Sequence, residues 1–96
     1  MPKVLLYITS KITWIFLFWN TDFNENRAHV HVGKKGTERL CKIWLEPDIE
    51  VADSGDLSTK QIQQIKEIAE QQKNTLLKQW NQFKKGKSIK IIQVKK

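Results

Sequence analysis

Two apolar stretches open the chain. Val4–Ile8 is a short run, and a longer run over Ile12–Trp19 follows it after the polar segment Thr9-Ser10-Lys11. Because successive side chains of a β-strand point to opposite faces, Ile12–Trp19 would be apolar on both of its faces. A strand of that kind usually lies inside a sheet whose two faces are both at least partly covered. We therefore predict two strands joined by a turn.

The next alternating stretch, Ala28–Val32, contains both histidines of the chain. In a strand, His29 and His31 would share one face, and the alanine and the two valines would share the other. The stretch ends at Gly33, which also opens a Gly-Lys-Lys-Gly segment that favours a hairpin turn. We predict a strand here, with the two imidazoles side by side.

The segments around this strand complete the predicted sheet. Residues 20–26 form a polar loop in which Phe23 is expected to fold back onto the core. Glu38–Leu45 alternates well enough to be the hairpin partner of the histidine strand. Ile49–Val51 could add a further short strand, and Ser88–Val94 a final one.

A single long helix is the clearest element of the pattern. Ser58 and Gln61 match a capping box, in which the serine hydroxyl and the glutamine amide satisfy free backbone donors. Lys84 and Lys85, followed by Gly86, are typical of a helix C-terminus. The helix is therefore predicted from about Thr59 to Lys84 or Lys85. The apolar positions at helical spacing between these ends are Ile62, Ile65, Ala69, Leu76, Trp80 and Phe83.

These elements predict one α+β domain over residues 1–96, because 96 residues are too few for two cores. It would have a mainly antiparallel sheet of about five strands, with one long amphipathic helix packed on one face. The two-sided apolar strand Ile12–Trp19 is the natural surface for the helix to cover.

Charge is unevenly distributed along the chain. The net charge is +7, and the last thirteen residues, from Lys84, contribute +6 through six lysines without an acid. The interval from residue 46 to residue 56 has five acids and no base. This distribution differs from that of a uniformly basic nucleic-acid binder.

The single cysteine, Cys41, permits no intrachain disulfide and fits a reducing compartment. The apolar N-terminal stretch is broken at residues 9–11 and is too short for a membrane span, which needs about 20 residues. We therefore expect a soluble, cytoplasmic protein with no membrane contact. Cys41 itself is expected to pack as a small apolar residue; as a nucleophile it would need an activating neighbour.

The order of several motifs resembles a known family. A His-Val-His-Val strand follows an aromatic strand and a polar loop, and its hairpin partner ends in Trp44-Leu45. Further on, a Leu-Leu-Lys-Gln-Trp helix segment (residues 76–80) precedes Gly-Lys-Ser-Ile-Lys-Ile (residues 86–91). Together these resemble the small prokaryotic proteins grouped as domain of unknown function 4160. The resemblance implies no established activity. It does imply a likeness to components of two-gene, toxin–antitoxin-like modules, which are often paired with another small protein.

The chain departs from that family in one place. The family pattern usually has two prolines, and often a further histidine, just before the paired histidines. Residues 23–28 here read Phe-Asn-Glu-Asn-Arg-Ala. A role that needs a third histidine or a rigid proline turn therefore does not carry over.

His29 and His31 are the candidate catalytic residues, with three readings open. The sequence favours a structural role, in which the imidazoles make hydrogen bonds on a half-buried face. Acid–base catalysis near neutral pH is an alternative. A metal site is another, although no resident metal or cofactor is predicted. Further metal ligands would have to come from the acidic or thiol side chains of Asp22, Glu25, Glu38 or Cys41.

Basic side chains form a candidate surface for anions or nucleic acid. One set is expected around the histidine hairpin and the other at the end of the helix, and both could neutralise phosphates. Interleaved aromatic residues for base stacking are missing from the tail, so a solvated cationic end is the plainer interpretation. The residues are Arg27, Lys34, Lys35, Arg39, Lys84, Lys85 and Lys87.

Three functions are compatible with these features. The first is an interaction protein in a two-gene module, meeting a partner encoded nearby through the acidic connector or an exposed sheet edge. The second is a small nuclease or phosphodiesterase that uses the two histidines. The third is RNA or DNA binding through the basic hairpin and tail. The sequence does not indicate the oligomeric state.

Overall fold

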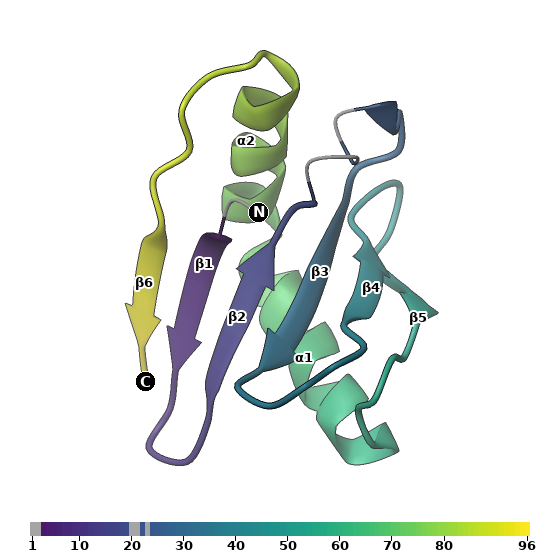
Figure 1. Ribbon diagram of the computed structural model, residues 1–96, viewed down its shortest axis with the longest axis vertical. Coiled ribbons are helices and arrows are strands. Elements are labelled where there is room, and N and C mark those ends of the chain that lie inside the picture. Colours follow the sequence, from purple (N-terminus) through teal and green to yellow (C-terminus); the bar gives the residue numbers. More distant parts are fainter. Residues whose placement is uncertain (1–2, 20–21, 23) are drawn as a thin grey trace.

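The computed structural model describes residues 3–19, 22 and 24–96. The expected position of Phe23 lies outside the described residues. Within them the chain forms six strands and two helices (Figure 1). In chain order these are β1 (Lys3–Ile8), β2 (Thr13–Leu17), β3 (His29–Lys34), β4 (Cys41–Trp44), β5 (Glu50–Asp53), α1 (Thr59–Gln71), α2 (Lys73–Lys84) and β6 (Ile92–Lys95).

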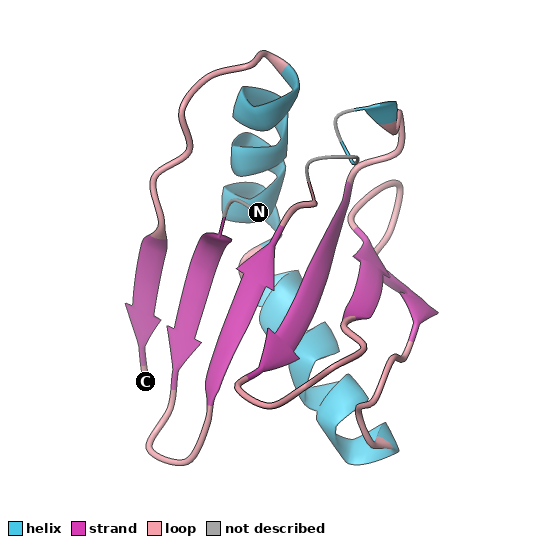
Figure 2. Ribbon diagram, viewed as in Figure 1, coloured by secondary structure: helices cyan, strands magenta, loops and turns pink. Residues whose placement is uncertain are grey.

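All six strands belong to one sheet, in the order β5-β4-β3-β2-β1-β6. Neighbours are antiparallel except for β1 and β6, which run parallel and place the first and last strands side by side. Both helices lie on the same side of this sheet (Figure 2). The predicted α+β class is therefore confirmed, and the sheet has one strand more than the five expected.

The sheet has two unlike faces. The covered face, beneath the helices, is formed by side chains with little or no exposure, and they belong to one apolar cluster with the helix residues Ile65, Leu76 and Trp80. The open face has no described helix or strand over it (Figure 1). The covered face consists of Leu5, Tyr7, Trp14, Phe16, Val30, Val32, Cys41 and Ile43. The open face includes Leu6, Ile8, Thr13, Ile15, Leu17, His29, His31, Lys42 and Trp44.

Two helices replace the single long one that the sequence predicts. The capping box at Ser58 and Gln61 is present, and α2 ends at Lys84 before Gly86, which has φ 74°. Between the helices, Gln72 departs from helical geometry with φ −102° and ψ 14°. The run Glu70–Thr75 contains no apolar residue, so the apolar stripe is interrupted there. The helix bends there, and each half buries its own apolar residues.

The partner strand of β3 is shorter than predicted, because β4 begins at Cys41 and not at Glu38. The residues before it hydrogen-bond to another part of the chain. Arg39 N–H donates to the Asp56 carboxylate at 2.8 Å, and Asp56 N–H donates to Arg39 O at 3.1 Å. Leu40 turns toward Gly33, where a Cβ would lie only 2.4 Å from the leucine Cδ2. These contacts prevent residues 38–40 from extending the ladder.

Neither helix has the combination of length and apolar character that a membrane span requires, as far as the described residues extend.

Candidate functional site

The two histidines lie where the sequence places them, on alternate positions of β3. His29 is the first residue of the strand and pairs with Trp44 of β4, whereas His31 pairs with Lys42. The His29 side chain is fully buried, and the His31 side chain is 13% exposed. The shared face predicted for the imidazoles is confirmed, and their ring centroids are 5.3 Å apart.

Asp22 joins the histidines from the loop that precedes β3. Its Oδ1 lies 3.0 Å from His29 Nε2 and its Oδ2 lies 3.1 Å from His31 Nε2, with 8% of the side chain exposed. A local turn fixes the aspartate, since Trp19 N–H donates to Oδ2 at 2.8 Å and Asp22 N–H donates to Trp19 O at 2.9 Å. One carboxylate therefore faces two imidazoles in a nearly closed space.

The orientation of His29 follows from its second ring nitrogen. Nδ1 lies 2.9 Å from Arg27 O, and a carbonyl oxygen can only accept, so Nδ1 carries a proton. Nε2, the other ring nitrogen, points into the space beside Asp22. Although the carboxylate is only 3.0 Å away, the two groups are misaligned, and this buried nitrogen makes no hydrogen bond. The cluster thus contains a buried polar atom without a partner.

His31 titrates lower than an ordinary histidine. Burial lowers its pKa most, the Asp22 carboxylate opposes that effect, and the nearby His29 and Lys42 lower it further. The imidazole is therefore neutral near pH 7. A neutral imidazole is the form that accepts a proton or binds a metal ion.

Aromatic rings enclose the cluster. His29 lies between Trp80 of α2, at 5.0 Å between ring centroids, and Trp44 of β4, at 5.5 Å. Trp19 stands edge-on to His31 at 5.7 Å and is 37% exposed. The site is therefore lined by apolar rings at its base and opens toward solvent beside His31 and Trp19.

Of the four further ligands that the sequence offers, the structure places Asp22 with the histidines. Cys41 lies on the covered face, and burial raises the pKa of its thiol to about 12, so it is neither a ligand nor an activated nucleophile. Its predicted role as a small apolar core residue is confirmed. Glu25 and Glu38 are exposed and do not belong to the cluster.

The basic residues predicted around the hairpin do not all lie beside the histidines. The Arg27 guanidinium lies over the Trp44 ring at 4.3 Å, close to the site. Lys34 is five residues further along β3 than His29, which is about 16 Å in a strand, and Lys35 follows it. Arg39 pairs with Asp53 at 3.2 Å.

Of the lysines at the end of α2, Lys84 lies near the site. Lys84 Nζ donates to Glu25 O at 2.7 Å and lies 5.8 Å from the Trp80 ring. Lys85 caps the helix, and Lys87 is exposed beyond it. The site residues named from the sequence therefore divide between opposite ends of β3.

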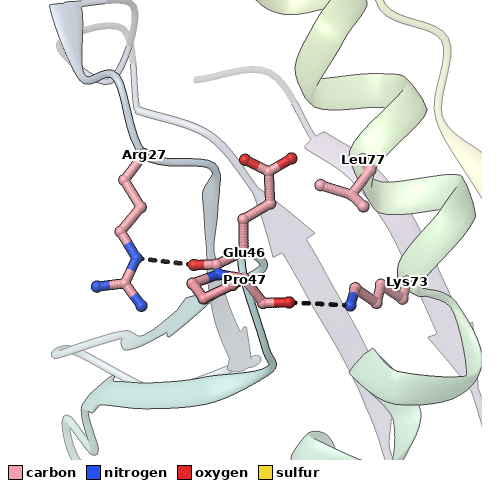
Figure 3. A pocket seen from close by; sticks show the side chains of 5 residues that line it. All are labelled: Arg27, Glu46, Pro47, Lys73 and Leu77. Atoms are coloured by element: carbon pink, nitrogen blue, oxygen red, sulfur yellow. Dashed lines mark hydrogen bonds between the residues drawn. The ribbon is translucent and has the colours of Figure 1, made fainter.

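A cleft of about 620 Å³ lies beside the site, between α2 and the segment that follows β4 (Figure 3). Its two cations are directed at backbone oxygens. Arg27 Nε donates to Glu46 O at 2.8 Å, and Lys73 Nζ donates to Pro47 O at 3.3 Å. These bonds hold the connector against α2. Both cations are therefore already hydrogen-bonded within the chain and are not directed at a ligand in the cleft.

Comparison with known proteins places the chain in a family. No curated protein and no solved structure matches it. A family profile does match, over residues 13–81, and this range contains β2 to β5, α1 and most of α2, together with the Asp22, His29 and His31 cluster. The chain therefore belongs to the family described as Domain of unknown function (DUF4160).

Proposed function

We propose that this protein is an interaction component of a two-gene, toxin–antitoxin-like module in the cytoplasm, and that its partner binds the open face of the sheet. The observation that carries the proposal is that β1 and β2 are apolar on both faces, whereas helices cover only one. In an antiparallel sheet with one solvated face, the outward positions are usually polar. Here the outward positions of β1 and β2 are Leu6, Ile8, Thr13, Ile15 and Leu17, of which Thr13 is polar and Leu17 is buried.

Two tryptophans add partly exposed apolar surface to this face. Trp19 follows β2 and is 37% exposed, and Trp44 on β4 is only partly buried. Contiguous apolar surface with aromatic residues and a polar rim is typical of a protein interface. The rim is supplied by Lys42 and Arg27, which lie over Trp44 at 4.5 Å and 4.3 Å.

The acidic connector is a weaker candidate for the contact surface than the sequence suggests. Glu50 of β5 pairs with Arg27 at 3.5 Å, and Asp53 pairs with Arg39 at 3.2 Å. The Asp56 carboxylate accepts a hydrogen bond from the backbone of Arg39. These acids are therefore already engaged within the chain, which supports the open face over the connector.

Hydrolysis of phosphodiesters and binding of nucleic acid stay predictions with less support. Both need several cations around one surface. Arg27 already bonds Glu46 O and Glu50, and Lys34 and Lys35 lie at the far end of β3 from His29.

The proposal is tested by co-expressing the chain with the protein encoded next to its gene and measuring co-purification. We expect a complex at micromolar concentration. Leu6→Glu and Ile15→Glu, each placing a charge on the open face, should reduce co-purification at least about tenfold. Gln63→Glu, an added charge at an exposed position of α1, is the matched control and should leave the complex intact.

Circular dichroism of the two open-face variants separates a lost interface from a lost fold. Sedimentation of the wild-type chain alone determines whether a second copy occupies the face. A monomer that forms no complex with the neighbouring protein would contradict the proposal, and so would a complex that survives both substitutions.

A further inference from the structure

The geometry points to a binding site for a divalent transition-metal ion, Zn²⁺ in the first place, held by the Asp22 carboxylate, His29 Nε2 and His31 Nε2. This inference is independent of the partner proposed above. The ligand atoms of the three residues all lie within 4.8 Å of one another. Two imidazoles and one carboxylate with an open position are a donor set typical of zinc and of non-haem iron, and nitrogen donors disfavour Mg²⁺ and Ca²⁺.

The first argument is the unpartnered nitrogen of His29. His29 Nε2 is buried and lies 3.0 Å from Asp22 Oδ1, yet the two atoms share no hydrogen bond. A buried polar atom without a partner costs free energy, and such atoms are rare in folded proteins. A metal ion bound by both groups would supply the missing partner.

The second argument is the misalignment itself. Two ligands of one metal ion point at the ion and not at each other. In tetrahedral or octahedral geometry, the line between the two ligand atoms makes an angle of about 35–45° with the lone pair that each directs at the ion. His29 Nε2 and Asp22 Oδ1 are close in this manner, within 3.0 Å but without hydrogen-bond geometry. A buried structural His–Asp pair would instead be expected to align its N–H with the carboxylate.

The third argument is the support behind the ligands. Metal-bound histidines commonly donate the other ring nitrogen to a carbonyl or carboxylate, which fixes the tautomer and the ring orientation. The contact of His29 Nδ1 with Arg27 O, at 2.9 Å, has this form. Asp22 is held by the amide of Trp19 at 2.8 Å. Two of the three ligands are thus oriented before any ion binds.

The surroundings also fit such a site. The Trp44 and Trp80 rings pack against His29 and exclude water from that side. The side chain of His31 is the most exposed of the three, at 13%, and lies beside Trp19. A further ligand, such as water or an anion, would therefore enter next to His31. Lys42 pairs with His31 across the ladder, and its charge opposes a bound dication.

The test is a titration of the full chain, first freed of metal by a chelator and then given Zn²⁺ alone, with Mg²⁺ as the control ion. We expect one equivalent of Zn²⁺ to bind with a Kd below about 10 μM. At about 100 times Kd, Tm should rise by roughly 10–20 °C. Replacing Zn²⁺ by Co²⁺ should give visible absorption bands of a low-coordinate site.

Two substitutions and one control make the assignment specific. Asp22→Asn and His31→Gln should each weaken Zn²⁺ binding by at least about 100-fold, because loss of a supporting residue alone costs 10–100-fold. Glu25→Gln, an exposed carboxylate three residues from Asp22, should bind as the wild type does. His29 is fully buried, so His29→Gln is interpreted only if its circular dichroism matches the wild type.

Three results would overturn the site. One is the absence of Zn²⁺ binding tighter than about 100 μM. Another is binding that survives both Asp22→Asn and His31→Gln, since the ion would then be held by other groups. The third is equal Tm shifts with Zn²⁺ and Mg²⁺, because imidazole ligands distinguish these ions.

Discussion

The two faces of the sheet differ most clearly at neighbouring residues of one strand. In β1, Leu5 points to the covered face and has no exposed surface, whereas Leu6 points to the open face and is only partly buried. In β3, Val32 is fully buried beneath the helices, and His31 on the opposite face is partly open to solvent. The same stretch of sequence therefore supplies the core through one set of positions and the candidate site through the other.

This difference separates what holds the fold from what is available to ligands. On the covered face, the removal of apolar surface from water stabilises the domain. The open face carries apolar, cationic and imidazole groups that the rest of the chain covers only in part. Substitutions on the first face should therefore act on stability, and those on the second should act on binding.

The largest expected effect comes from truncating the two leucines of β1 in turn. Leu5→Ala leaves a cavity in a fully buried site and should lower the free energy of unfolding by about 2–5 kcal/mol. Leu6→Ala should cost about 1 kcal/mol or less, because its side chain is already partly in water. Urea unfolding followed by circular dichroism measures both. Equal losses would mean that the open face is as important to the fold as the covered face.

A smaller effect is expected at Gln79, the polar exception among the buried residues of α2. Its Nε2 donates to Val4 O at 3.1 Å and to Lys90 O at 2.7 Å, which joins the helix to β1 and to the segment before β6. Gln79→Leu should cost about 1–3 kcal/mol, since a buried carbonyl loses its donor. Gln63→Leu at an exposed position of α1 is the matched control for urea unfolding. No change in Gln79→Leu would show that neither bond contributes to stability.

The smallest effect belongs to the rim of the open face. Lys42 Nζ lies 4.5 Å from the centre of the Trp44 ring, and Lys42→Gln should lower stability by about 0.5–1 kcal/mol through loss of this cation–π contact. Lys66→Gln, an exposed lysine on α1, is the control. A loss above 2 kcal/mol would place Lys42 among the residues that stabilise the fold.

The sequence predicts the covered face well, because burial imposes a regular pattern. The alternation of β3 and the helical spacing from Ile65 to Trp80 are sufficient to identify these core residues. The bend at Gln72 has no such signal, since a polar run on a helix is ordinary and no proline or glycine marks it. The early end of the hairpin at residues 38–40 depends on bonds to Asp56, which lies seventeen positions from Arg39.

The candidate site is predictable in part. Two histidines on one strand face indicate where to look, and Asp22 is one of four carboxylate or thiol groups that could join them. Spacing alone does not choose among the four, because the choice depends on how the loop folds. Trp19 and Asp22 close that loop through paired backbone and side-chain bonds. The sequence also places the basic residues of the hairpin together, whereas strand length separates Lys34 from His29.

The parallel pairing of β1 with β6 has a consequence for synthesis of the chain. Ile8 ends β1 and Ile92 begins β6, 84 positions later. At a translation rate of about 5–20 residues per second, β6 is synthesised roughly 4–17 s after β1. During that interval the nascent chain has an unpaired edge strand with apolar side chains on both sides, which is a template for other chains. Completion of this sheet, and protection of β1 from aggregation, therefore depend on a strand made 84 positions later.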